Sequence, residues 1–279
     1  MTKLKYSALM TVYAKEKPAF FDQAIQSLVQ QSIIPDEIVI VCDGPLTDEL
    51  DALLASYKKK KGLTFRIVRL EVNSGAGVAT QAGLLECRND LVMKLDSDDW
   101  CVPERAERQL REFELRPSLS VCGSYMAEFL GDPSNAIQVR TVPLEQDEIA
   151  AYARRRNPIN NITVMYRKSD VLAAGGYSDL RRCQDYELYA RMLSHGYEMC
   201  NIPEVLASAR LSTENLSRRA SFATTRGFIH IHWLLYREHF SSLPDFIIPS
   251  VAQLVYVVMP RKLRDFAYRK IFRRDSRSF

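Results

Sequence analysis

Apolar and polar positions along the first hundred residues alternate between strand-like runs and helix-like spacing. The pattern predicts four strands, at Tyr6–Val12, Ile38–Cys42, Thr64–Leu70 and Leu91–Leu95. Between them it predicts helices that begin near Pro18, begin at Thr47 or Asp48, and cover Val78–Cys87. Strands that alternate with helices at this spacing indicate a parallel sheet with helices on its faces.

Each of these four strands runs into a polar cluster. The clusters are Tyr13–Glu16, Asp43–Gly44, Asn73–Gly75 and Asp96–Asp99. In open parallel sheets, ligands bind beyond the carboxyl ends of the strands. We therefore expect the four clusters to converge on one ligand site.

The second half of the chain is less regular. Strands are expected at Ser120–Phe129, Ile137–Val142, Ile162–Arg167 and Glu204–Leu211. Helices are expected at Pro103–Leu115, Glu145–Arg155 and Asp185–His195. From Ser217 onward, aromatic and basic residues compatible with helix replace this mixture.

Composition excludes several classes of protein. The chain has 279 residues, 47% apolar and 26% charged, which is typical of a globular protein. Its six cysteines include no Cys-x-x-Cys pair, which disfavours zinc knuckles and thioredoxin chemistry and favours a reducing compartment. No apolar run approaches the ~18 residues of a membrane-spanning helix, and the N-terminus does not resemble a signal peptide. A cytoplasmic protein is expected.

Positive charge is concentrated at the C-terminus. Residues 261–279 hold eight basic and two acidic residues, a net of +6, whereas the whole chain carries only +4. The other residues therefore sum to −2, which argues against a nucleic-acid-binding body. The basic segment predicts contact with an anionic membrane surface. A helix that packs its apolar face on the body remains the alternative.

The most specific chemical signal is Asp96-Ser97-Asp98-Asp99. Three carboxylates in four residues repel one another unless a cation lies between them, and carboxylate oxygens suit Mg²⁺ or Mn²⁺. The alternative is a solvated acidic turn before the next helix. The apolar residues that precede the turn favour a metal site, because they place it at the mouth of a buried strand.

Three further positions have both a functional and a structural interpretation. Asp43 either accepts hydrogen bonds from a ligand or makes an Asx-turn before Gly44. Asn73–Gly77 suggests a dinucleotide-binding loop, but Thr80 stands where that motif requires a third glycine. Asp185 opens a helix, where it is either a functional carboxylate or a structural one, as the helix N-cap or an acid of the first turn.

Together these residues resemble the family 2 glycosyltransferases over about residues 5–215. The similarity includes Thr11-Val12-Tyr13, Asp43, Asn73-x-Gly75, Leu95–Asp99, Asn157–Met165, Gly175-Gly176-Tyr177 and Gln184–Leu188. The subgroup that it resembles is found in bacterial exopolysaccharide or lipopolysaccharide biosynthesis. Val258–Arg264 is similar to the same subgroup.

The resemblance implies an α/β GT-A fold, with a mixed, mainly parallel sheet flanked by helices and a helical C-terminal extension. It implies a catalytic domain over 1–216, with a nucleotide-sugar-binding half (1–100), an acceptor-binding half (101–216) and a basic extension (217–279). The implied activity is inverting, metal-dependent transfer of a sugar from a nucleoside-diphosphate sugar, with a UDP-sugar favoured. The acceptor would be a saccharide or a lipid-linked molecule, at the inner face of the cell membrane.

Carried onto this sequence, the resemblance implies roles for individual residues. Asp185 would be the catalytic base, and Asp98 and Asp99 would bind Mn²⁺ or Mg²⁺. The implied nucleotide-sugar-binding residues are Thr11, Tyr13, Asp43, Asn73, Gly75, Asp96 and Asp98. Arg210 and Arg218 are candidates for diphosphate contacts, or else surface residues.

Two alternatives from other classes remain. A nucleotidyltransferase also combines clustered carboxylates with a nucleotide on an α/β sheet, but it needs no base such as Asp185. A catalytically silent sugar-nucleotide-binding protein would need neither the base nor turnover.

Overall fold

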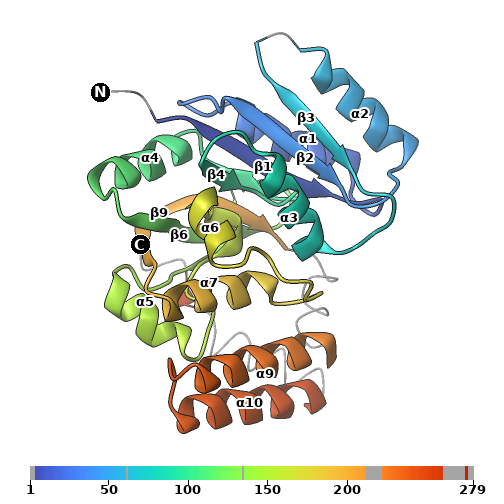
Figure 1. The fold of residues 1–279 in the computed structure, drawn as a ribbon. Helices are drawn as coiled ribbons and strands as arrows, with labels where there is room; N and C mark the ends of the chain where they lie inside the picture. Colours follow the sequence, from blue (N-terminus) through green and yellow to red (C-terminus); the bar gives the residue numbers. More distant parts are fainter. Residues whose placement is uncertain (1–3, 61, 134, 212–221, 260–273, 276–279) are drawn as a thin grey trace.

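The computed structural model describes residues 4–60, 62–133, 135–211, 222–259 and 274–275 (Figure 1). The strands are β1 (Tyr6–Val12), β2 (Glu37–Cys42), β3 (Phe65–Arg69), β4 (Leu91–Lys94), β5 (Trp100–Cys101), β6 (Leu119–Phe129), β7 (Ala136–Arg140), β8 (Met165–Arg167), β9 (Glu198–Arg210) and β10 (Arg274–Asp275). The helices are α1 (Pro18–Val29), α2 (Asp48–Lys58), α3 (Ala76–Glu86), α4 (Arg105–Leu115), α5 (Gln146–Ala153), the 3₁₀ turn η1 (Asn161–Thr163), α6 (Lys168–Ala173), α7 (Gln184–Ser194), α9 (Phe222–Arg237) and α10 (Leu243–Val258).

The ten strands of the described residues belong to one mixed sheet. Its main path runs β10-β7-β6-β8-β4-β1-β2-β3, and β9 pairs with β6 and β5. The first four predicted strands form the parallel block β4-β1-β2-β3. Strand β8 runs antiparallel to both β4 and β6, whereas β9 runs parallel to β6. The mixed sheet flanked by helices confirms the expected fold class.

Alternating strand residues supply two separate cores, one on each face of the sheet. Tyr6, Ala8 and Met10 of β1 pack with α1, α2 and α4, while Leu9 packs with α3, α6 and α7 on the opposite face. Both faces of β1, β2 and β4 are therefore covered, which explains why these three strands read as nearly continuous apolar runs.

The observed elements differ from the predicted ones mainly in the second half. The strand expected at Ile162–Arg167 is shortened to β8, because Thr163 Oγ1 donates to the Asn160 carbonyl oxygen (2.8 Å) and fixes a 3₁₀ turn. Strand β9 begins at Glu198, ahead of the expected Glu204, because Met199–Ile202 pairs with β6. The two-residue β5 and the short α6 have no clear signal in the sequence.

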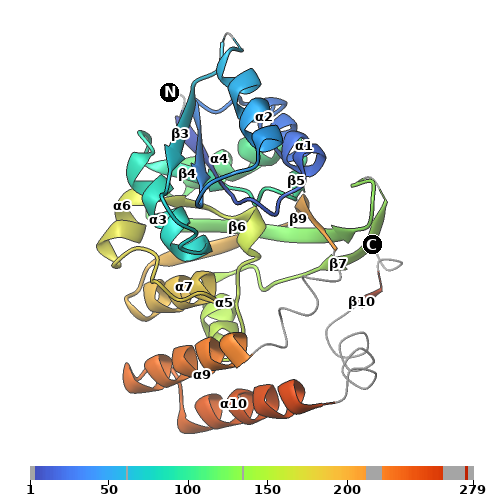
Figure 2. The same ribbon diagram turned by 90° about the vertical axis from the view of Figure 1, so that its right-hand side faces the viewer.

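The C-terminal helices form successive layers beneath α7. Figures 1 and 2 show α9 below α7 and α10 below α9. Tyr186 and Ala190 of α7 pack against Ile231 and Leu235 of α9. This arrangement confirms the helical extension. None of the described helices has the length and hydropathy needed to cross a bilayer.

Helix α10 begins with a capping box that also makes an ion pair. Asp245 N–H donates to Ser242 Oγ, and Ser242 N–H donates to the Asp245 carboxylate. Arg155 Nε lies 2.7 Å from Asp245 Oδ1 and ties α10 to the segment after α5. Burial alone would raise the pKa of Asp245, but the Ser242 and Arg155 hydrogen bonds outweigh it and lower the pKa.

Asp245→Ala is expected to destabilise the fold by about 1–2 kcal/mol, because it removes the ion pair with Arg155 and the carboxylate that accepts from Ser242 N–H in the capping box. The lowered pKa means that the carboxylate stabilises the fold above its ordinary value of 3.8 and loses this effect as pH falls through the lowered pKa. Urea unfolding from neutral to acidic pH measures this difference. Asp147→Ala, an exposed acid in the first turn of α5, is the matched control. If the difference in free energy of unfolding between Asp245→Ala and the unaltered chain did not change with pH, the electrostatic contribution of Asp245 would be contradicted.

Candidate active site

The ends of the parallel strands meet at one edge of the sheet, as predicted. Val12 of β1 is in register with Cys42 of β2, and Asp43 N–H donates to the Val12 carbonyl oxygen (2.8 Å). Leu95 N–H donates to the Leu9 carbonyl oxygen (3.1 Å), so the acidic turn after β4 begins beside β1. These bonds fix the starting points of the loops that carry the candidate residues.

Asp43 holds the loop after β3. Its Oδ1 accepts a hydrogen bond from Ser74 N–H (2.7 Å), and its Oδ2 accepts one from Gly75 N–H (3.0 Å). Asn73 Nδ2 donates to the Asp43 carbonyl oxygen (3.1 Å). Gly75 has φ +93°, a backbone conformation that favours glycine. Three of the predicted nucleotide-sugar residues are thus brought together, and each carboxylate oxygen of Asp43 keeps a second lone pair for a ligand.

Four carboxylates gather at the acidic turn. Glu16, which follows β1, accepts a hydrogen bond from Ser97 Oγ (2.8 Å) and joins Asp96, Asp98 and Asp99. Burial first, and then the charges of Glu16 and Asp96, raise the pKa of Asp98 to about 6. Burial and the charge of Asp98 also raise the pKa of Asp99. Glu16 belongs to the polar cluster predicted after β1, but no role was expected for this residue.

Arg210, at the end of β9, closes the acidic turn from the other side. Its N–H donates to Asp99 Oδ1 (2.9 Å), and its Nε donates to the Asp98 carbonyl oxygen (3.1 Å). The guanidinium lies 3.8 Å from the ring centroid of Phe20 and 4.6 Å from that of Phe129. Arg210 is therefore at the site and almost fully buried, and its contact with a diphosphate stays a prediction. Arg218 lies outside the described residues.

Lys94 is a buried cation between the two acidic parts of the site. It is 4% exposed, and its ammonium makes an ion pair with Asp96. Although burial alone would lower its pKa, the charge of Asp96 and then that of Asp185 raise it. The only sequence signal for this role is a charged residue inside an otherwise apolar strand.

Asp185 is the second residue of α7, and its charge interacts with the carboxylate turn. Asn157 Nδ2 donates to Asp185 Oδ2 (2.8 Å). Burial raises the pKa of Asp185, the Lys94 ammonium lowers it, and the Asp96 carboxylate raises it. The residue at the N-cap is Cys183, with φ +62°, so Asp185 is not the cap. Its role as a base stays a prediction.

A close contact joins the start of α3 to the start of α7. A Cβ on Gly77 would lie 2.5 Å from the Ser178 carbonyl oxygen and 3.3 Å from Gln184 Cβ. Gly77 therefore lets the loop held by Asp43 approach the residue that precedes Asp185. Thr11 and Tyr13 lie at the end of β1, on the same edge of the sheet.

The acidic turn has the chemistry of a site for a hard divalent cation. It offers carboxylate oxygens whose burial, and then mutual repulsion, raise the pKa of Asp98 and Asp99, and a cation would relieve that repulsion. Among the described residues, no three His, Cys, Asp or Glu side chains form a preassembled metal cage. In proteins, Mg²⁺ is commonly bound by one or two carboxylates together with substrate phosphates.

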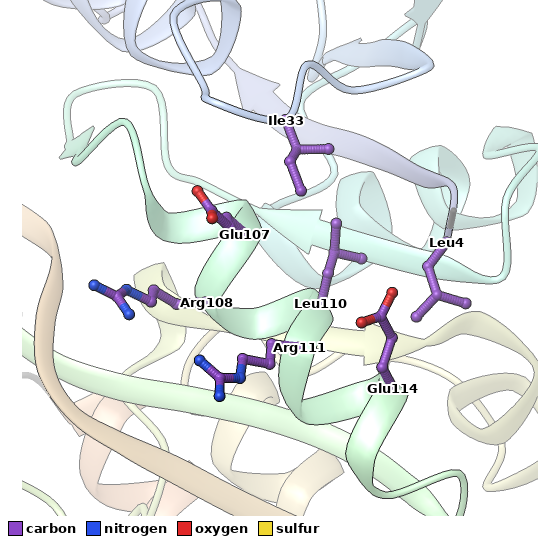
Figure 3. A pocket seen from close by; sticks show the side chains of 7 residues that line it. All are labelled: Leu4, Ile33, Glu107, Arg108, Leu110, Arg111 and Glu114. Atoms are coloured by element: carbon purple, nitrogen blue, oxygen red, sulfur yellow. The ribbon is translucent and has the colours of Figure 1, made fainter. Parts of the chain in front are cut away.

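A separate cavity of about 280 Å³ lies at the opposite end of β1 (Figure 3). It is lined by Leu4, Ile33, Glu107, Arg108, Leu110, Arg111 and Glu114. Leu4 precedes β1 and most of the other residues belong to α4, so this cavity is not part of the candidate active site.

Comparison with known proteins finds relatives of this chain among the glycosyltransferases. The family model "Glycosyl transferase family 2" matches residues 7–172. An uncharacterized glycosyltransferase of Haemophilus influenzae is 34% identical over 97% of this chain and 100% of that protein. The UDP-Gal:alpha-D-GlcNAc-diphosphoundecaprenol beta-1,3-galactosyltransferase of Escherichia coli is 32% identical over 97% of each chain. The amylovoran biosynthesis glycosyltransferase AmsE of Erwinia amylovora is 32% identical over 95% of this chain and 98% of that protein.

Two solved structures share the fold at low sequence identity. S. aureus TarS 1–349 in complex with UDP-GlcNAc superposes with a TM-score of 0.65 at 17% identity, covering 94% of this chain and 70% of that one. Mannosyltransferase PcManGT from Pyrobaculum calidifontis, in complex with GDP-Man and Mn²⁺, gives 0.66 at 12% identity, covering 91% and 70%. These similarities confirm the expected GT-A architecture.

Proposed function

This chain belongs to glycosyl transferase family 2, and from that premise we propose that it is an inverting, metal-dependent glycosyltransferase of bacterial polysaccharide biosynthesis. The observation that carries the proposal is the pairing of two acidic groups across one site. Asp185 opens α7, the carboxylate turn follows β4, and Lys94 interacts with an acid of each group. Inversion in one displacement needs this division between a base and a group that binds the leaving diphosphate.

In the proposed reaction, Asp185 accepts the proton of the acceptor hydroxyl as that oxygen attacks the anomeric carbon. The anomeric carbon–oxygen bond to the diphosphate breaks on the opposite face. Asn157 orients the Asp185 carboxylate through its 2.8 Å hydrogen bond, and Lys94 favours the ionised form of this base. Asp98 and Asp99 would hold Mn²⁺ or Mg²⁺, which when bound supplies positive charge to the departing diphosphate.

We propose that the donor is a UDP-sugar. Asp43 would contact the nucleobase, and the loop that it holds would place Asn73 and Gly75 beside the nucleotide. Thr11 and Tyr13 would line the same pocket, and Asp96 would contact the ribose. In support, the E. coli relative is named for UDP-Gal, and the TarS structure contains UDP-GlcNAc.

The proposed acceptor is a saccharide or a lipid-linked saccharide. The E. coli relative is named for a diphosphoundecaprenol acceptor, and it matches this chain over 97% of its length. An enzyme with such an acceptor would work at the inner face of the cell membrane. The predicted membrane contact through 261–279 stays a proposal, because the described part of that segment is limited to Arg274–Asp275.

We also propose a division of the chain into a catalytic domain over 1–216 and an extension over 217–279. The nucleotide-sugar-binding half would cover 1–100, and the acceptor-binding half 101–216. The parallel block and the Asp43 loop lie in the first half, and Asp185 lies in the second.

A panel of nucleotide sugars with Mn²⁺ or Mg²⁺ tests the function. We expect one UDP-sugar to raise the melting temperature only when metal is present, and to release UDP when a matching acceptor is added. EDTA should abolish both effects. Stabilisation by a nucleoside triphosphate would indicate a nucleotidyltransferase, provided that adding a sugar phosphate then releases pyrophosphate. Binding of a nucleotide sugar without transfer to any acceptor would indicate a silent binding protein.

A further inference from the structure

Helix α10 presents an apolar face on the outside of the molecule. Figures 1 and 2 show it as the outermost layer, resting on α9. Ile247, Val251, Leu254 and Val258 recur at intervals of four, three and four residues, and all are exposed. Ile248 (57% exposed) and Val255 (51% exposed) widen this stripe. Between residues 246 and 259 the sequence holds no charged residue and no histidine.

The polar side chains of α10 lie on its inner side instead. Asp245 and Ser250 are buried, and Gln253 Nε2 donates to Thr225 Oγ1 of α9 (3.2 Å). A surface helix in water normally has the reverse arrangement, with its apolar stripe toward the core. The outer face of α10 therefore exposes a contiguous apolar surface of the kind that marks an interaction site.

The neighbouring helix α9 carries exposed cationic and aromatic groups. Arg226, His230, Trp233 and Arg237 occupy exposed positions of α9 at intervals of four, three and four residues. The Trp233 ring lies 5.8 Å from that of Phe246, which connects this stripe to α10. Directly after α10, the sequence of residues 261–279 carries a net of +6. Tryptophan and basic residues around an apolar helix face are typical of helices that bind membrane interfaces.

We propose that the outer face of α10 docks in the plane of an anionic lipid bilayer, with its apolar side chains among the acyl chains. The exposed cations of α9 and the net positive sequence that follows α10 match anionic headgroups, whereas a twofold dimer through α10 would bring like charges toward each other. A helix of 16 residues is about 24 Å long, shorter than the ~30 Å hydrocarbon core, so it lies along the surface. This folded surface would add to the membrane contact proposed for residues 261–279. Its binding does not depend on the transfer chemistry.

The test uses the full chain and vesicles of phosphatidylethanolamine with phosphatidylglycerol. The triple variant Ile248→Ser, Val251→Ser, Val255→Ser is expected to lower partitioning roughly a hundred-fold, because three apolar side chains lose their transfer to lipid. The matched control, Ile34→Ser, Leu85→Ser, Leu115→Ser, removes equally exposed apolar side chains elsewhere. It should partition like the unaltered chain. Replacing phosphatidylglycerol by phosphatidylcholine, or adding salt, should weaken binding of the unaltered chain.

A second measurement does not use the triple variant of α10. With Trp100→Phe, Trp233 is the only tryptophan, and its fluorescence should shift to the blue on vesicles and be quenched by brominated acyl chains. Absence of quenching, or equal partitioning by both triple variants, would overturn the proposal. So would a concentration-dependent dimer that the α10 variant abolishes while vesicle binding is unchanged. Retained turnover of a water-soluble acceptor by the α10 variant separates this result from the proposed activity.

Discussion

Asp185→Asn is expected to lower kcat by about 10²–10⁴-fold while the affinity for the sugar donor is retained. The substitution keeps the shape of the side chain and an oxygen that accepts the hydrogen bond from Asn157. It removes the group that would take the proton of the acceptor hydroxyl. Turnover is measured by release of UDP with a matching acceptor, and donor affinity by calorimetry with Mn²⁺ present.

The pH profile gives an independent check on the same residue. Burial raises the pKa of Asp185 above its ordinary value of 3.8, so the base becomes protonated, and kcat falls, at a higher pH than for an exposed aspartate. Asp147→Asn, which alters an exposed carboxylate of α5, should keep both rate and profile. An Asp185→Asn enzyme with unchanged turnover, or a kcat that stays constant down to pH 3.8, would rule out Asp185 as the base.

Asp98→Asn is expected to abolish metal-dependent donor binding. Losing an outer-shell partner typically costs ten- to a hundred-fold in metal affinity, so loss of a direct ligand should exceed about a hundred-fold. Without metal, the variant should be at least as stable as the unaltered chain, because it relieves repulsion from Glu16 and Asp96. Titration of Mn²⁺ in the presence of UDP, followed by calorimetry, measures the first effect, and thermal unfolding in EDTA measures the second.

Thermal unfolding in EDTA distinguishes loss of a metal ligand from misfolding of the Asp98→Asn variant. A variant that bound the donor poorly because it was misfolded would melt at a lower temperature without metal. The Asp147→Asn control should match the unaltered chain in both measurements. Unchanged metal-dependent donor binding by Asp98→Asn would contradict the role of Asp98 as a ligand.

The parallel half of the fold was accessible from sequence because its signals are local. Apolar runs such as Ile38–Cys42 predict strands by themselves, and a turn residue such as Gly44 ends each run. Once strands and helices alternate, the geometry of a parallel sheet brings the loops at the strand ends together. The convergence of Asp43 with Asn73 and Gly75 follows from this rule.

The other contacts of the candidate site depend on pairings between residues distant in sequence. Lys94 interacts with Asp185 across 91 positions, and Arg210 N–H reaches Asp99 across 111, so no local pattern encodes either contact. The apolar residues at positions 246–259 did not predict where α10 begins and ends, nor that its apolar side faces outward. Periodicity indicates that one side of a helix is apolar, but it does not indicate what that side contacts.

The lack of a side chain at Gly77 has a consequence for redesign of this enzyme. Its backbone lies close to both Ser178 and Gln184, so the two halves of the chain are in contact where one would bind the nucleotide and the other carries Asp185. An engineer who rebuilds the Asn73–Gly75 loop to accept another sugar nucleotide has to keep glycine at position 77. Even alanine there would push the two halves apart, and the new substrate would be bound at a distance from the residue meant to act on its acceptor.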